Sequence, residues 1–126
     1  MKFYSAFFGL LLVLAIMNSS LWAADHRIGL TEAQAKARAA ELTHTAFPGT
    51  HVYPDLERPM SPGFYGVELH WDQLVEGNQV AAFLQIDRLN GNVFQFEGVT
   101  CYQYGPDKKM HEVHPNGKLR MPDVCE

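Results

Sequence analysis

Histidine is the residue type in this chain that most invites a metal-binding interpretation, because its ring nitrogens are common ligands of transition metals. Six are present, and the closest pair is His111 and His114 in the segment His-Glu-Val-His. On a helix this spacing places both side chains on one face, whereas on a strand it places them on opposite faces. Pro115 follows at once and the flanks are typical of strand or loop. We therefore predict no metal site here, and the remaining candidates are too scattered to assign: His44, His51 and His70.

Acidic residues could supply paired carboxylates for general acid–base catalysis. The candidates are Asp72, Glu76 and Asp87, and each has a simpler role. Asp72 and Glu76 would solvate a loop, and Asp87 can cap the turn at Asn90-Gly91. The sequence has no serine in a nucleophile elbow and no glycine-rich phosphate loop after a strand. We therefore predict that the protein is not an enzyme and uses no cofactor.

Two cysteines, Cys101 and Cys125, bracket the C-terminal part of the chain. No other thiol is present that could complete a redox motif or a thiolate zinc site. In an exported protein such a pair persists as a disulfide, and closing this loop stabilises a fold by roughly 3 to 3.5 kcal/mol. We predict a structural Cys101–Cys125 bridge rather than a reactive or metal-binding pair.

The first residues have the pattern of a secretory signal peptide. Met1-Lys2 supplies a positive charge, an apolar run extends from Ala6 to Met17, and small residues lead to Ala23. The run is shorter than the ~20 residues of a membrane-spanning helix, which is the alternative interpretation. We expect cleavage after Ala23, which leaves residues 24–126 as one domain in the periplasm or outside the cell, with no membrane span.

The charge balance bears on the choice of partner. The sequence holds ten basic and fourteen acidic residues, and cleavage would remove Lys2 and no acidic residue. The chain also lacks a basic stripe. Nucleic acid is therefore excluded as an expected partner.

One helix is predicted near the start of the domain. Thr31 and Gln34 have the spacing of a capping box, and the stretch from Glu32 to Ala46 is rich in alanine. Phe47-Pro48-Gly49 would end it. The apolar residues that fall on one stripe are mostly small, so the helix can lie close against a sheet: Ala35, Ala39, Leu42 and Ala46.

Three antiparallel strands are predicted after the helix, over Phe64 to Trp71, Gln79 to Asp87 and Asn92 to Glu97. The first two alternate apolar and polar residues in the period of a half-buried strand. Asn90-Gly91 indicates a tight hairpin between the second and the third. A brief strand at His51 and a proline-rich loop precede them, and the polar segment 72–78 is predicted to be a connecting loop.

The pattern weakens after Gly98. Val99 to Tyr104 could extend the sheet, and Pro115-Asn116-Gly117 could turn a short second hairpin between Met110 and Met121. The predicted fold is therefore α+β, with one N-terminal helix packed across an antiparallel sheet and a C-terminal extension, from about residue 98, closed by the disulfide.

Three groups of residues resemble a PepSY domain. Leu30-Thr31-Glu32-Ala33 opens an alanine-rich helix, Tyr65-Gly66-Val67-Glu68-Leu69 forms a central strand, and Ile86-Asp87 precedes Gly91-Asn92-Val93 with the family's spacing. The resemblance covers roughly residues 30–96; the proline-rich loop and the C-terminal extension have no counterpart in the family pattern. It implies a cystatin-like fold and a non-catalytic role in restraining peptidases or in regulation at the cell surface.

Aromatic side chains indicate where a partner would bind. A single helix covers one face of the sheet, so some aromatic residues on the strands should point outward. Phe64 and Phe83 fall out of phase with the apolar residues that face the helix, and they would form a contact surface. The alternative surface is the proline-rich loop around Arg58 and Met60, where methionine offers an adaptable apolar contact.

The sequence therefore predicts an exported, non-catalytic binding module whose partner is a peptidase or another envelope or secreted protein. Two alternatives stay open. One is an inhibitor of another secreted hydrolase such as lysozyme. The other is a small-ligand carrier, which would need an apolar pocket of ~300 Å³ or more. The oligomeric state is not determined by these patterns.

Overall fold

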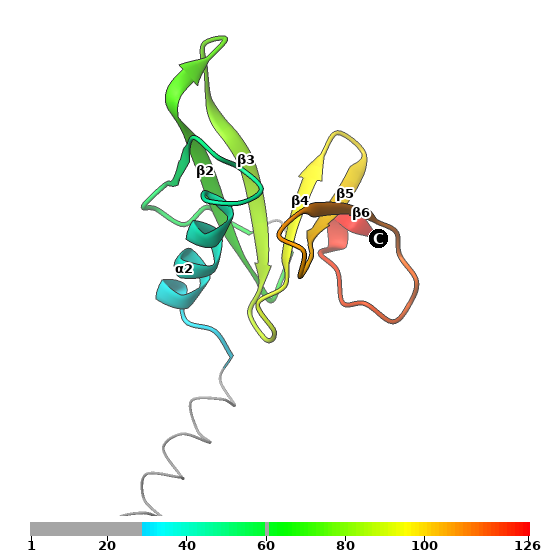
Figure 1. The fold of residues 1–126 in the computed structure, drawn as a ribbon. Coiled ribbons are helices and arrows are strands. Elements are labelled where there is room, and N and C mark those ends of the chain that lie inside the picture. Colours follow the sequence, from blue (N-terminus) through cyan, green and yellow to red (C-terminus); the bar gives the residue numbers. More distant parts are fainter. Residues whose placement is uncertain (1–28, 60) are drawn as a thin grey trace, which may run out of the picture.

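The computed structural model describes residues 29–59 and 61–126 (Figure 1). The predicted signal peptide, residues 1–23, lies outside this range. The described chain is an α+β arrangement in which one α-helix packs with a six-stranded antiparallel sheet. In chain order the elements are α2 (Glu32–Leu42), β1 (Thr50–Val52), β2 (Phe64–Val75), β3 (Asn78–Asp87), β4 (Val93–Glu97), β5 (Thr100–Tyr104), β6 (Met110–Val113) and the short 3-10 helix η1 (Asp123–Cys125).

Helix α2 begins at the predicted capping box. The hydroxyl of Thr31 accepts a hydrogen bond from the Gln34 N–H at 3.2 Å, and the Gln34 side chain accepts one from the Thr31 N–H at 2.8 Å. One stripe of the helix packs on β1 and β2, and its fully buried members are the predicted ones: Ala35, Ala39 and Leu42. No helix among the described residues has the length and hydrophobicity needed to cross a bilayer.

The helix is shorter than predicted. It ends at Leu42, whereas the alanine-rich pattern extends to Ala46. The hydroxyls of Thr43 and Thr45 donate hydrogen bonds to carbonyls of the last helical turn, and the Phe47 N–H donates to the Leu42 carbonyl. These bonds fold residues 43–47 into turns, because threonine side chains compete with the backbone for helical carbonyls.

The six strands form a meander in which each strand is antiparallel to the next. β2 and β3 pair regularly from Phe64 opposite Asp87 to Leu69 opposite Ala82, which confirms these two predicted strands. Both continue beyond their predicted ends, so segment 72–78, predicted to be a loop, lies mostly in strands. The side chains of this segment are exposed, so it lacks the alternation by which a half-buried strand is recognised.

The hairpin between β3 and β4 forms at the predicted place, but its turn is longer than a two-residue loop. The Asp87 carboxylate accepts a hydrogen bond from the Leu89 N–H at 2.8 Å, and the Asn90 side chain accepts one from the Asn92 N–H at 2.9 Å. Only Gly91 takes a positive φ, of 76°. Asp87 therefore caps the turn, as its position predicted.

A first core lies between α2 and the sheet face that it covers, which we call the helix face. Alanines of the helix meet branched residues of the central strands, and the buried members from the sheet are Val67, Leu69, Ala82, Leu84, Ile86, Val93 and Tyr104. The small helical side chains allow the close approach that the sequence predicted. At the edge of this core, the Tyr65 hydroxyl donates a hydrogen bond to the Leu30 carbonyl at 2.8 Å and fixes the entry to the helix.

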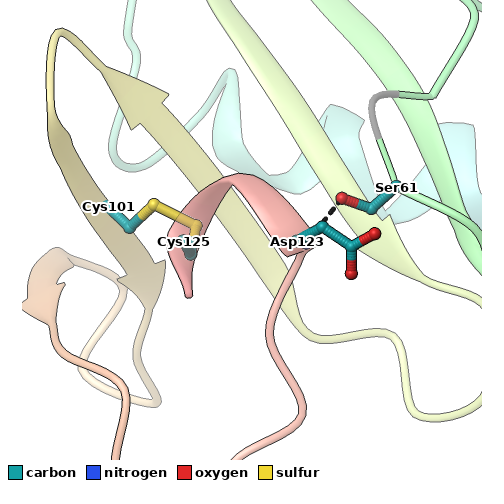
Figure 2. The surroundings of a disulfide bond; sticks show 4 residues. All are labelled: Ser61, Cys101, Asp123 and Cys125. Atoms are coloured by element: carbon teal, nitrogen blue, oxygen red, sulfur yellow. Dashed lines mark hydrogen bonds between the residues drawn. A yellow bond between two sulfur atoms is a disulfide. The ribbon is translucent and has the colours of Figure 1, made fainter.

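A second core covers part of the opposite face, which we call the far face. The C-terminal segment crosses β4 and β5 and buries a small apolar cluster there: Phe64, Phe94, Cys101, Met121 and Cys125. Cys101 on β5 is bonded to Cys125 in η1, which confirms the predicted disulfide (Figure 2). The backbone N–H of Asp123 also donates a hydrogen bond to the Ser61 hydroxyl at 2.7 Å, so η1 is fastened to the proline-rich loop as well (Figure 2).

The predicted hairpin between Met110 and Met121 is wrong. β6 instead pairs back on β5 across the turn at residues 105–109. The Asn116 side chain accepts hydrogen bonds from the N–H groups of Lys118 and Leu119, which closes a local turn instead of starting a strand. The C-terminal extension therefore adds β5 and β6 to the sheet, and its last part, residues 114–126, covers the far face.

Candidate functional site

The most exposed part of the sheet is the distal half of the β2–β3 hairpin, residues 72–81, which we call the arm. β1 pairs with β2 only as far as Trp71, and β4 pairs with β3 only from Leu84 to Ile86. Among the described residues the arm therefore has no neighbouring strand on either side, and it projects beyond the rest of the described fold (Figure 1). Its pairing is irregular, because the register shifts between Leu69 and His70 and again before Val75.

The arm carries apolar side chains that the rest of the described chain leaves exposed. Leu74 is 67%, Val75 45% and Val80 37% exposed, and these are three of the five large hydrophobic residues that are exposed among the described residues. Such clustering on one projecting element marks an interaction site more strongly than scattered apolar residues do. Because the register shifts disrupt the ladder, contact through side chains is favoured over the addition of another strand.

A polar cluster lies on the far face where the arm joins the sheet. His51 on β1 stands opposite His70 on β2, with ring centroids 6.1 Å apart. Each ring has its own carboxylate: His51 Nδ1 lies 2.7 Å from Asp72, and His70 Nε2 lies 2.7 Å from Glu68. The sheet register thus gathers two histidines that are scattered in the sequence.

The neighbours of this cluster limit what it can do. Tyr53 stacks on the buried His70 ring at 4.3 Å. Within residues 29–59 and 61–126, no three His, Cys, Asp or Glu side chains are arranged to hold one metal ion. Each imidazole instead bonds to its own carboxylate, His51 to Asp72 across β1 and β2 and His70 to Glu68 within β2, and the first of these bonds ties the base of the arm to β1.

The carboxylates considered for acid–base chemistry do not converge. Asp72 lies at the base of the arm against His51, and Glu76 occupies the turn at its tip. Asp87 is completely buried at the other end of β3, where it faces Arg120 at 3.3 Å. The structure thus places these three groups at three separate points of the hairpin.

Two further carboxylates have lowered pKa values, and both lie near the β5–β6 turn. A hydrogen bond from Lys108 is the main cause of the lowered pKa of Glu41 on α2, and the charge of Arg38 adds to it. A hydrogen bond from His111 is the main cause of the lowered pKa of Asp107 within the turn. The Lys108–Glu41 pair spans 3.0 Å and fastens this turn to the helix.

The predicted contact residues fall in different environments. Phe64 is 4% exposed beneath the C-terminal segment, so the prediction that it lies on an exposed aromatic face is wrong. The disulfide-closed segment covers this part of the far face, and the sequence pattern did not indicate which face of the sheet this segment would cover. Phe83 is half-buried on the far face opposite Glu68, and Arg58 is exposed in the proline-rich loop. Met60 lies outside the described residues.

A shallow groove opens on the helix face beyond the end of α2. It has a volume of about 490 Å³, and it lies between residues 45–47, which follow α2, and side chains of β4, β5 and β6. Aromatic, polar and charged side chains line it in similar measure, among them Phe47, Gln95, Glu97, Tyr102, Lys109 and Met110. This size is within the range of small-ligand sites, although such sites are usually more enclosed and more apolar.

Sequence reasoning missed the apolar residues of the arm. Leu74 and Val75 adjoin Glu76-Gly77, and a polar segment with glycine is typical of a loop. The signal that could have found the arm is Gly77 itself, because a residue–glycine pair between two strands, here Glu76-Gly77 between Val75 and Asn78, is also the pattern of a tight hairpin turn. Comparison with known proteins adds nothing to this site: no family model, curated protein or solved structure matches the chain.

Proposed function

We propose that this protein is an exported, non-catalytic binding module that restrains a peptidase or regulates another secreted or envelope protein. The observation that carries the proposal is the arm. A projecting hairpin with exposed Leu74, Val75 and Val80 is a convex apolar element. Its burial in a concave surface of another protein is favourable, because apolar side chains are then removed from water.

Two further features support this function. A helix packed on an antiparallel sheet is compatible with the cystatin-like fold that the PepSY resemblance implies, and with the regulatory role of that family. The Cys101–Cys125 bridge fits an oxidising compartment such as the periplasm or the extracellular space.

The polar groups also favour binding over catalysis. Both histidines at the base of the arm are engaged with carboxylates, and the three candidate acids lie at separate points. A catalytic site would need a nucleophile or general base aimed at a shared position for substrate. The polar cluster supports the arm instead.

The test compares two double variants for binding to purified peptidases and for capture of envelope proteins. Leu74→Ser with Val80→Ser removes apolar contact from the arm. Leu89→Ser with Val99→Ser is the matched control, because both residues are exposed hydrophobics at other turns. We expect the arm variant to lose a partner that the control retains. Equal capture by both variants would exclude the arm as the binding element.

The groove of about 490 Å³ favours a second candidate function, a small-ligand carrier. Its aromatic residues Phe47 and Tyr102, together with Glu97 and Lys109, would suit a ligand with both apolar and charged groups. Native mass spectrometry of protein purified from its source tests this candidate. A retained small molecule that is lost in Tyr102→Ala would favour the carrier.

A further inference from the structure

The tip of the arm is a two-residue turn with an unusual residue in it. Val75 pairs with Asn78, and the two residues between them both have positive φ: 52° at Glu76 and 76° at Gly77. This geometry is that of a type I′ hairpin turn, in which asparagine or aspartate is strongly preferred at the first position. Glutamate has no short side-chain carbonyl to support the left-handed conformation, so it is a strained choice here.

Nothing within the described chain accounts for glutamate at this position. Its side chain is exposed and forms no ion pair or hydrogen bond with residues 29–59 or 61–126. Open space surrounds the position that a Cβ of Gly77 would take, so no packing contact from the described residues requires glycine there. A strained residue without an internal role, at the end of a projecting element, is a position where function outweighs stability.

The charges on the arm are negative. Residues 72–81 contain no lysine or arginine, and they contain two acidic residues, Asp72 and Glu76. Asp72, at the base of the arm, is paired with His51, which leaves the Glu76 carboxylate as the unpaired charge beside exposed Leu74 and Val75. An acidic tip flanked by apolar side chains is complementary to an apolar cleft with a cationic rim.

We infer that the arm enters the substrate cleft of a cationic secreted hydrolase and that the Glu76 carboxylate contacts a lysine or arginine at that cleft. This inference rests on the proposed function and names the chemistry of its partner. The apolar residues supply the buried contact, and the carboxylate supplies orientation and a faster association. Glu76 is retained in an unfavourable conformation because asparagine would keep the turn but lose the charge.

The experiment uses the intact oxidised protein and three purified cationic hydrolases as probes: trypsin, papain and chicken lysozyme. Two variants separate charge from strain. Glu76→Gln removes the charge and keeps the strain, whereas Glu76→Asn removes both. Glu32→Gln, an exposed glutamate at the start of α2, controls for the change in net charge. Association rates, residual hydrolase activity and thermal midpoints are measured for each variant, at low and at high salt.

We expect wild type to bind and inhibit at least one probe, and both Glu76 variants to associate roughly tenfold more slowly at low salt, a difference that salt removes. Glu76→Asn should also raise the thermal midpoint by about 4 °C, and Glu76→Gln should not. If the Leu74/Val80 variant loses binding while Glu76→Gln binds like wild type, the role of the carboxylate is refuted and the proposed function stands. If the Leu74/Val80 variant binds like wild type, the arm does not contact the partner, and both the role of Glu76 and the proposed function are refuted. Binding of wild type to none of the three probes overturns the cationic hydrolase as the partner.

Discussion

Replacement of Arg120 by methionine should destabilise the protein strongly, although the residue lies in the irregular C-terminal segment. Its guanidinium Nε stands 3.3 Å from Oδ2 of Asp87, whose side chain is completely buried, whereas the Arg120 side chain is 42% exposed. No hydrogen bond satisfies Asp87 Oδ2 within the described residues. Arg120 is therefore the group that compensates a buried negative charge.

The magnitude follows from this geometry. Two unit charges 3.3 Å apart attract by about 5 kcal/mol at an effective dielectric constant of about 20. Solvent around the half-exposed guanidinium screens part of this energy, so we expect Arg120→Met to lower the free energy of unfolding by roughly 2–3 kcal/mol. Loss of the stacking of Arg120 on Phe64, at 5.4 Å, is included in that range.

Urea unfolding followed by circular dichroism measures the change, with every protein oxidised. Arg120→Lys keeps the charge and should cost less than half as much. Arg120→Met combined with Asp87→Asn removes both charges and should recover most of the loss, because the uncompensated charge is then absent. A loss below about 0.5 kcal/mol for Arg120→Met, the range of ordinary surface substitutions, would refute the assignment of Arg120 as the counter-ion of Asp87.

Three further predictions concern the two cores and the charge network. Replacing Cys101 and Cys125 by alanine should lower the free energy of unfolding by about 3.5 kcal/mol in chemical denaturation, and a loss under about 1 kcal/mol would show that the disulfide is not needed to hold the C-terminal segment. Leu84→Ala, at the centre of the first core, should cost on the order of 2–5 kcal/mol, and an effect typical of surface sites would place it outside that core. The pKa of Glu41 is lowered from 4.5 in the folded protein. The ionised Glu41 side chain therefore contributes fully to the free energy of unfolding above pH 4.5, and this contribution is lost as the pH falls through the lowered pKa of the folded state. Lys108→Ala should therefore reduce the loss of stability on acidification below pH 4.5, and an unchanged profile would contradict the pairing.

Local signals predicted the local structure well. The capping box at Thr31 and Gln34 fixed the start of the helix, and the alternation within residues 64–71 identified a central strand, because each depends on neighbouring residues alone. The disulfide was predictable because Cys101 had a single possible partner.

Long-range features could not be predicted in the same way. The burial of Phe64 depends on a segment about 60 residues further along the chain, which carries no periodic pattern of its own. The arm was hidden for the opposite reason: residues 72–78 are exposed on both faces, so Leu74 and Val75 show no alternation. The pairing of His51 with His70 arises from strand register, which a single sequence does not specify.

Hydrogen–deuterium exchange of the protein in complex with a partner tests the central claim most directly. The partner is whichever protein is captured by wild type and by the Leu89/Val99 control, or whichever probe hydrolase binds. We predict that amides of residues 72–81, beside which the described part of the chain places no further strand, gain protection in the complex, while those around the groove at residues 95–110 exchange as in the free protein. Protection confined to the groove, with unchanged exchange in the arm, would contradict the account.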